Sequence, residues 1–195
     1  QSAITGLDAR KHHHQPLIQQ HVARIAATLL GVFAIVCGAQ AADFVAPNLV
    51  EISPRIITSG QPTTLALAAL GKQNVEVVIF LVPDGISSNV PGEAAILQRQ
   101  GITFVHIPIP FGAPTVEHYA AFAGAMTKYA DKKVLVHCEI NLRASSMVFL
   151  YRVIALKEDT HRAYEAVAKV WSPRGAWKPF LQDILRKHAI TFEPY

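Results

Sequence analysis

Two hydrophobic patterns alternate along the chain from about residue 54 onward. Continuous runs of apolar, often β-branched residues are typical of buried strands, and they predict strands over 54–58, 75–82, 103–107 and 133–137. Apolar residues spaced three and four apart, bounded by caps and breakers, predict helices over 63–70, 91–100, 115–129, 160–171 and 177–188, with a further helix directly after Cys138. Gly71 and Gly101 are expected to end the first two helices.

This alternation predicts the fold class. Strands that alternate with helices favour an α/β fold, a single domain whose mostly parallel central sheet is flanked by helices. Ligands bind such sheets beyond the carboxyl ends of the strands. The loops over 83–89 and 108–114 and the loop after Cys138 are therefore expected to meet at one edge of the sheet.

Residues 1–41 have a different pattern and are expected to lie outside this domain, which would then span 42–195. Arg24 precedes an apolar run over 25–37, and Ala39-Gln40-Ala41 follows it as a small-x-small cleavage pattern. The run is shorter than the roughly 20 residues that a membrane span needs. We therefore expect a signal peptide cut near Ala41 and a periplasmic or secreted protein, with a retained N-terminal membrane anchor as the alternative.

Removal of this leader changes the charge and the cysteine count. It takes away three of the 18 basic residues and one of the 14 acidic residues, which leaves a formal charge of +2. Such a small charge argues against nucleic acid as a partner and against stable membrane contact after cleavage. Cys138 then stands alone, so it cannot form an internal disulfide and is either a buried packed thiol or a reactive one.

The residues around Cys138 favour the reactive thiol. A β-branched run ends in His137-Cys138, a short loop follows, and Arg143 opens a helical pattern. Unpaired N–H groups and the dipole at a helix N-terminus attract anions and stabilise a thiolate over a thiol. The planar guanidinium of an arginine suits a tetrahedral oxyanion.

These residues resemble the loop of the cysteine-dependent phosphatases, the protein-tyrosine and dual-specificity class. That loop has five residues between Cys and Arg, whereas four separate Cys138 from Arg143 here. The short loop is similar to a bacterial branch of beta-lactamase-hydrolase-like phosphatases, as are Ser59-Gly60-Gln61-Pro62-Thr63, His106-Ile107-Pro108-Ile109 and Ala113-Pro114-Thr115. The resemblance spans about 51–187 and implies a cysteine-phosphatase-like fold.

The resemblance also implies roles for individual residues. Cys138 would be the nucleophile, Arg143 would hold the oxyanion, and His137 would orient the loop by bonding to backbone. Substrate would be bound by the loop residues, which are Glu139, Ile140, Asn141, Leu142, Ala144 and Ser145. Asn141 is expected to shape the loop through side-chain to backbone bonds, and Glu139 to point out to solvent.

The general acid is where this sequence departs from the family pattern. An Asp that commonly follows the strand corresponding to 103–107 protonates the leaving oxygen, and Pro110 stands at that place here. Asp84 is our candidate for the acid, with Glu117 and His118 as the alternatives. Loss of a general acid typically lowers a rate by about 10²–10⁴-fold.

Three functions fit the sequence. The first is hydrolysis of phosphate monoesters on a protein or a small molecule through a cysteinyl-phosphate. The second is a rhodanese-like sulfurtransferase that uses a Cys138 persulfide, because rhodaneses also carry a short loop and need no acid. The third is a non-catalytic anion-binding module. None of the three requires a cofactor or a metal ion.

Overall fold

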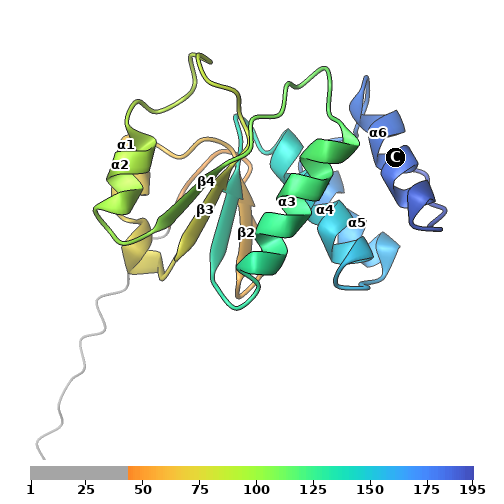
Figure 1. Cartoon of the computed structure of the whole chain (residues 1–195), viewed down its shortest axis with the longest axis horizontal. Helices are drawn as coiled ribbons and strands as arrows, with labels where there is room; N and C mark the ends of the chain where they lie inside the picture. The colour runs from red at the N-terminus through yellow and green to blue at the C-terminus, as the bar shows by residue number, and fades with distance from the viewer. Residues whose placement is uncertain (1–43) are drawn as a thin grey trace, which may run out of the picture. The chain divides into compact units, whose positions relative to one another are not determined.

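A five-stranded sheet forms the centre of the domain. The structure, a computed structural model, describes residues 44–195, so the predicted leader and its cleavage point lie outside the described residues. The strand order is β1 (Val50–Ser53), β2 (Ile56–Ser59), β5 (Val134–His137), β3 (Val77–Phe80) and β4 (Thr103–His106). Only β1 runs antiparallel to its neighbour, so the predicted mostly parallel sheet is confirmed (Figure 1).

The strand register brings four strand ends into one row. His137 pairs with Ser59 on one side and with Phe80 on the other, and Phe80 pairs with His106. Because these strands are parallel, the loops that follow them all leave from the same edge of the sheet. The loop after Cys138 therefore lies between the loops that follow β2 and β3.

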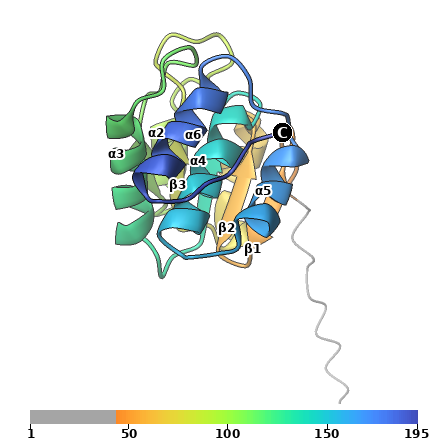
Figure 2. The same ribbon diagram turned by 90° about the vertical axis from the view of Figure 1, so that its right-hand side faces the viewer.

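Helices cover both faces of the sheet. One face carries α1 (Thr64–Ala68), the short 3₁₀ helix η1 (Leu70–Gln73) and α2 (Glu93–Gln98). The other face carries α3 (Val116–Lys128), α4 (Leu142–Ile154), α5 (Thr160–Ala168) and α6 (Trp177–Lys187) (Figures 1 and 2). This arrangement agrees with the fold that the alternating sequence pattern predicts.

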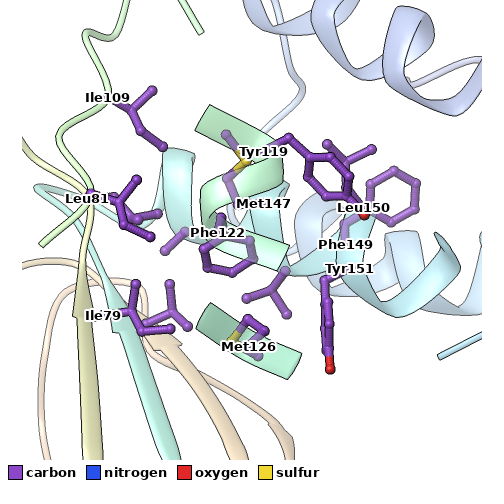
Figure 3. Close-up of a cluster of buried hydrophobic side chains, with 14 of the residues drawn as sticks. Ile79, Leu81, Ile109, Tyr119, Phe122, Met126, Met147, Phe149, Leu150 and Tyr151 are labelled. Carbon is purple, nitrogen blue, oxygen red and sulfur yellow. The ribbon is translucent and has the colours of Figure 1, made fainter. Parts of the chain in front are cut away.

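Alternate strand residues enter two separate hydrophobic cores. Val78 and Leu135 pack with the α1 and α2 side, whereas Val77, Ile79 and Val136 pack with the larger layer of helices. Figure 3 shows part of the larger core, where Ile79 and Leu81 of the sheet side lie across from Phe122, Met126 and Met147 of the helices. Burial on both faces explains why the strands have continuous apolar sequences.

Helix α4 lies at the centre of the larger core. Every residue from Arg143 to Ile154 is buried, so this helix is packed on all sides. Its first turn is consequently held in place by the whole helical layer. None of the helices within residues 44–195 is both long and apolar enough to cross a membrane.

Some local predictions were wrong. Strand β1 was not predicted, and β2 begins at Ile56 because Pro54 and Arg55 form the turn that joins the two strands. Gly71 does not end the first helix but lies within η1. Asn74 ends η1 in a left-handed conformation with φ 59°. Gly101 follows α2 with φ 72°, as expected for a residue that terminates a helix.

Candidate active site

Cys138 lies directly after the central strand β5. Its backbone N–H donates to the carbonyl of Ser59 at 3.2 Å, which extends the pairing of β5 with β2 by one residue. The thiol is free and the residue is fully buried. Cys138 thus forms the floor of the loop, and its position is fixed by the sheet.

Neighbouring segments hold the outer side of the loop. The carbonyl of Glu139 accepts from the backbone N–H of Gln61 at 3.0 Å, and the carbonyl of Ile140 accepts from the Asn48 side chain at 2.9 Å. In a trans peptide the following N–H points away from the carbonyl. The N–H groups that follow these two carbonyls therefore face away from Gln61 and Asn48.

Asn141 makes the turn from the loop into α4. It has φ 73°, in the left-handed region that asparagine tolerates better than most residues. Its side-chain amide donates to the carbonyl of Asn48 at 2.6 Å and to Thr58 Oγ1 at 3.1 Å. The expectation that Asn141 shapes the loop through its side chain is confirmed, while its contact with substrate stays a prediction.

Arg143 extends from the first turn of α4 and is almost completely buried. Its Nε donates to the carbonyl of Ile109 at 2.9 Å, and its guanidinium carbon lies 5.0 Å from the centroid of the Phe111 ring. Both contacts come from the proline-rich loop that follows β4. This loop therefore orients the guanidinium beside the cysteine loop, through a backbone acceptor and a cation–π contact.

The other loop residues lie where the sequence placed them, around the start of α4. Ile140 is exposed, Leu142 is half-buried, and Ala144 and Ser145 are buried. The Ser145 hydroxyl donates to the carbonyl of Leu142 at 3.3 Å, a bond within the helix. Their predicted contact with substrate stays a prediction.

Glu139 differs from the expectation that it points away into solvent. Its side chain is 42% exposed, but Oε2 lies 3.8 Å from Arg143 Nη1. The side chain thus faces Arg143 from the edge of the loop. The two residues are four positions apart in the sequence, but Glu139 lies in the loop before α4, so the contact depends on the path of the loop.

His137 makes a buried contact that the sequence did not reveal. Its Nε2 lies 2.6 Å from Oε1 of Glu93, at the start of α2, and both side chains are nearly inaccessible. Oε2 of Glu93 accepts from the Gln61 side chain at 2.9 Å, and the His137 ring stacks on Phe80 at 4.9 Å. His137 is therefore oriented by a carboxylate rather than by backbone. The sequence feature that could have indicated this contact is Glu93, an acidic residue at the start of an otherwise apolar helix.

The three candidates for the general acid have different surroundings. Asp84 is exposed on the loop after β3, at the same edge of the sheet as Cys138. His118 Nδ1 accepts from the Thr115 N–H at 3.1 Å in a capping box of α3. The backbone N–H of Glu117 and the Thr115 hydroxyl lower the pKa of Glu117 from its ordinary value. A lowered pKa keeps Glu117 ionised near neutral pH, without a proton to donate, and capping occupies His118, so Asp84 is the freest of the three.

An aromatic cluster lies beside Arg143. Phe111, at the tip of the proline-rich loop, has its ring 6.0 Å from that of Trp171 and 5.9 Å from that of Trp177. The carbonyl of Phe111 accepts from the Trp177 indole at 2.9 Å, and Trp177 is fully buried. Trp177 is thus a core residue that anchors the loop, and the part-exposed Phe111 ring forms a wall next to the arginine.

The chain matches a known family model over most of its length. The family model described as "DSP-PTPase phosphatase fused to NAD+ Kinase" matches residues 27–175. The chain belongs to this DSP-PTPase family. The resemblance to protein-tyrosine and dual-specificity phosphatases is therefore confirmed, and so is the phosphatase-like fold.

Individual relatives support the same assignment. The beta-lactamase hydrolase-like protein of Xylella fastidiosa (strain Temecula1) is 32% identical over 110 residues, which are 55% of this chain and 25% of that protein. This match thus spans about a quarter of the curated relative. A candidate phosphatase (DUF442) from Shewanella putrefaciens CN-32 is 29% identical with a TM-score of 0.66, over 73% of this chain and 91% of its own.

A more distant solved structure shares the fold. Tk-PTP in its active form superposes with a TM-score of 0.59 at 22% identity, over 74% of this chain and 97% of its own. At that identity the likeness concerns the fold alone. Together with the family match, it supports a phosphatase-like fold.

Proposed function

We propose that the chain is a cysteine-dependent phosphatase that hydrolyses phosphate monoesters through a cysteinyl-phosphate. The observation that supports this most strongly is the geometry of the loop. Cys138 lies at its floor, two of its carbonyls are bonded to segments outside it, and Arg143 is fixed at its rim by the Ile109 carbonyl. Such a loop offers N–H groups and one guanidinium to a tetrahedral oxyanion.

The reaction would take place in two steps. In the first, the Cys138 thiolate attacks phosphorus, a P–S bond forms, and the ester P–O bond breaks as the leaving oxygen takes up a proton. In the second, water attacks the phosphorus, the P–S bond breaks, and inorganic phosphate and the thiolate are released. Arg143 and the loop N–H groups would hold the same phosphoryl oxygens in both steps, where negative charge develops.

Hydrolysis of p-nitrophenyl phosphate by the full chain tests this proposal. We expect Cys138→Ser to abolish phosphate release and Arg143→Ala to lower it by about 10²–10³-fold, the usual effect of losing one oxyanion donor. Cys37→Ser and Arg186→Ala are the matched controls, since Arg186 is exposed on α6 and pairs with Asp183. Equal activity of the two cysteine variants would contradict the proposal.

The same variants separate the phosphatase from a sulfurtransferase. A persulfide mechanism would transfer sulfur from thiosulfate to cyanide in a Cys138-dependent manner and release no phosphate. A folded protein that is silent in both assays would instead be an anion-binding module. The family match favours the phosphatase over both alternatives.

We propose Asp84 as the general acid of the first step. Asp84→Asn should lower hydrolysis of phenyl phosphate by about 10²–10⁴-fold, because phenolate is a poor leaving group that needs a proton. Hydrolysis of p-nitrophenyl phosphate should change far less, because p-nitrophenolate leaves without one. Asp131→Asn, at the opposite edge of the sheet, is the control, and equal losses with both substrates would rule out this role for Asp84.

We also propose that the domain over 42–195 acts outside the cytoplasm, after cleavage near Ala41. The support is the apolar run over 25–37 with its small-x-small end. N-terminal sequencing of the protein from a periplasmic or culture-medium fraction tests this. A mature N-terminus at residue 42 is expected, and an uncut chain in the membrane fraction would favour the anchor instead.

A further inference from the structure

Glu139 is an unusual residue to find beside an oxyanion site. It directly follows the nucleophile, and its carboxylate Oε2 lies 3.8 Å from Nη1 of Arg143. Arg143 is buried while the Glu139 side chain is 42% exposed, so the pair spans the boundary between the loop and solvent. A substrate held by Arg143 would have to share this guanidinium with a carboxylate already in place.

The backbone of Glu139 cannot withdraw to relieve this competition. Its carbonyl accepts from the Gln61 N–H at 3.0 Å, and Gly60 packs so closely that an added Cβ would lie 2.8 Å from that oxygen. Only rotation of the side chain can move the carboxylate, and every rotamer starts from the same fixed Cα next to Cys138. The negative charge therefore stays within a few bonds of the loop.

A charge count shows what this carboxylate does to an incoming anion. With Cys138 in the thiolate form that the proposed mechanism uses, Cys138 and Glu139 each contribute one negative charge and Arg143 one positive charge, while the start of a helix adds roughly half a positive charge. The loop is thus close to neutral or slightly negative before any ligand enters. A dianion meets twice the repulsion from Glu139 that a monoanion of the same shape meets.

We propose that Glu139 sets the charge class of the ligand, making the loop selective for singly charged tetrahedral oxyanions over doubly charged ones. This inference rests on the proposed phosphatase site and specifies its substrate class. The fitting groups are phosphate esters that carry one negative charge, either singly protonated monoesters or diesters. Phosphate monoesters lose their second proton near pH 6, so this selectivity would favour the protonated monoester.

Two oxyanions of one shape and different charge test the proposal. Tungstate is a tetrahedral dianion, and perrhenate is its isoelectronic monoanion. Equilibrium dialysis of the full chain against each anion at pH 7.5, at one fixed low ionic strength, gives both dissociation constants from the tungsten and rhenium content. The variants are Glu139→Gln and, as a control, Glu76→Gln, which removes a charge at the opposite edge of the sheet where Glu76 pairs with Lys132.

The expected result is a change in the ratio of the two constants. Wild type should bind perrhenate at least as tightly as tungstate. Glu139→Gln should tighten tungstate about tenfold and perrhenate about threefold, because the repulsion scales with ligand charge, and Glu76→Gln should leave the ratio unchanged.

The possible failures are distinguishable. If tungstate is preferred by wild type, or if Glu139→Gln leaves the ratio unchanged, Glu139 does not set the charge class while the anion site itself stands. If neither anion binds to wild type or to Glu139→Gln, the proposed anion-holding loop is itself overturned.

Discussion

Gly60 is the residue at which three pieces of backbone come closest to one another. Its N–H donates to the carbonyl of Pro47 at 2.6 Å, and it pairs across a β-bridge with Ile140. A Cβ at this position would lie 2.8 Å from both the Glu139 carbonyl oxygen and Pro47 Cβ. Gly60 is therefore required by close approach, and the backbone of the cysteine loop rests directly on it.

Gly60→Ala should consequently disturb both stability and the site. Because the contacts are with backbone and a proline ring, they cannot yield by a simple rotamer change, and overpacking of this kind costs about 1–3 kcal/mol. We expect a loss of that size in the free energy of unfolding, measured by urea titration, together with slower p-nitrophenyl phosphate hydrolysis.

Gly112→Ala provides the control for this substitution. An added Cβ at Gly112 has no atom within 4 Å. Unfolding free energies that fall equally in the two variants, or a Gly60→Ala protein as stable and active as wild type, would contradict the close-packing argument.

At the level of elements, Glu93 connects three segments that are distant in the sequence. It opens α2, contacts His137 at the end of β5, and accepts from Gln61 in the loop between β2 and α1. All three segments adjoin the cysteine loop, so this one carboxylate holds α2 and α1 against the strand that leads into Cys138. Cys138 is the next residue along from His137, so the connection bears directly on the site.

Removing Glu93 should destabilise the domain substantially. Deleting one partner of a buried hydrogen-bonded pair typically costs about 1–3 kcal/mol, because the other partner is left buried and unpaired. We therefore expect a loss of that order for Glu93→Ala in denaturant titrations, and a smaller loss for Glu93→Gln, which keeps a hydrogen-bond acceptor.

The control for Glu93 is another glutamate to alanine change. Glu165 is exposed on α5, and its replacement should alter stability by no more than about 0.5 kcal/mol. A Glu93→Ala protein that is as stable as Glu165→Ala would show that the Glu93–His137 contact contributes nothing to folding.

At the scale of the whole molecule, the larger layer of helices contains two buried tyrosines that affect stability at high pH. Burial raises the pKa of Tyr119 on α3 to about 12, with a smaller contribution from nearby Tyr151. Burial also raises the pKa of Tyr164 on α5 to about 12. In the unfolded chain both groups titrate near pH 10.

The sign of the effect follows from these values. A group whose pKa is raised on folding does not change the free energy of unfolding at pH values below its pKa in the unfolded chain. It lowers that free energy as the pH rises from the unfolded-state pKa to the folded-state pKa. The free energy of unfolding should therefore fall between pH 10 and pH 12, by up to about 2–3 kcal/mol for each tyrosine.

Tyr119→Phe should make that decline less steep when stability is measured by urea titration at each pH. Tyr129→Phe is the matched control, because Tyr129 is only half-buried at the C-terminal end of the same helix. An identical pH dependence in Tyr119→Phe and wild type would exclude a contribution from this tyrosine.

The sequence by itself determined the α/β fold and the place of Cys138 between a strand and a helix, because both are encoded over a few neighbouring residues. Continuous apolar runs marked the buried strands, and threonine caps marked helix starts, as Thr63 and Thr115 confirm. The His137-Cys138 pair could be recognised from the end of one strand. Arg143, five positions after Cys138, could be recognised from the start of the helix that follows. Asn141 could also be assigned its loop-shaping role from the sequence.

Only the tertiary structure decided which distant groups complete the site. The Ile109 carbonyl that holds Arg143 is 34 residues away from it, and Glu93 is 44 residues away from His137. Strand β1 likewise depends on its pairing with β2 rather than on a pattern of its own. The local pattern of hydrophobic residues indicates burial and helix caps within one or two turns of the chain. Contacts between distant residues depend instead on the order and register of the strands, which are established only in the folded protein.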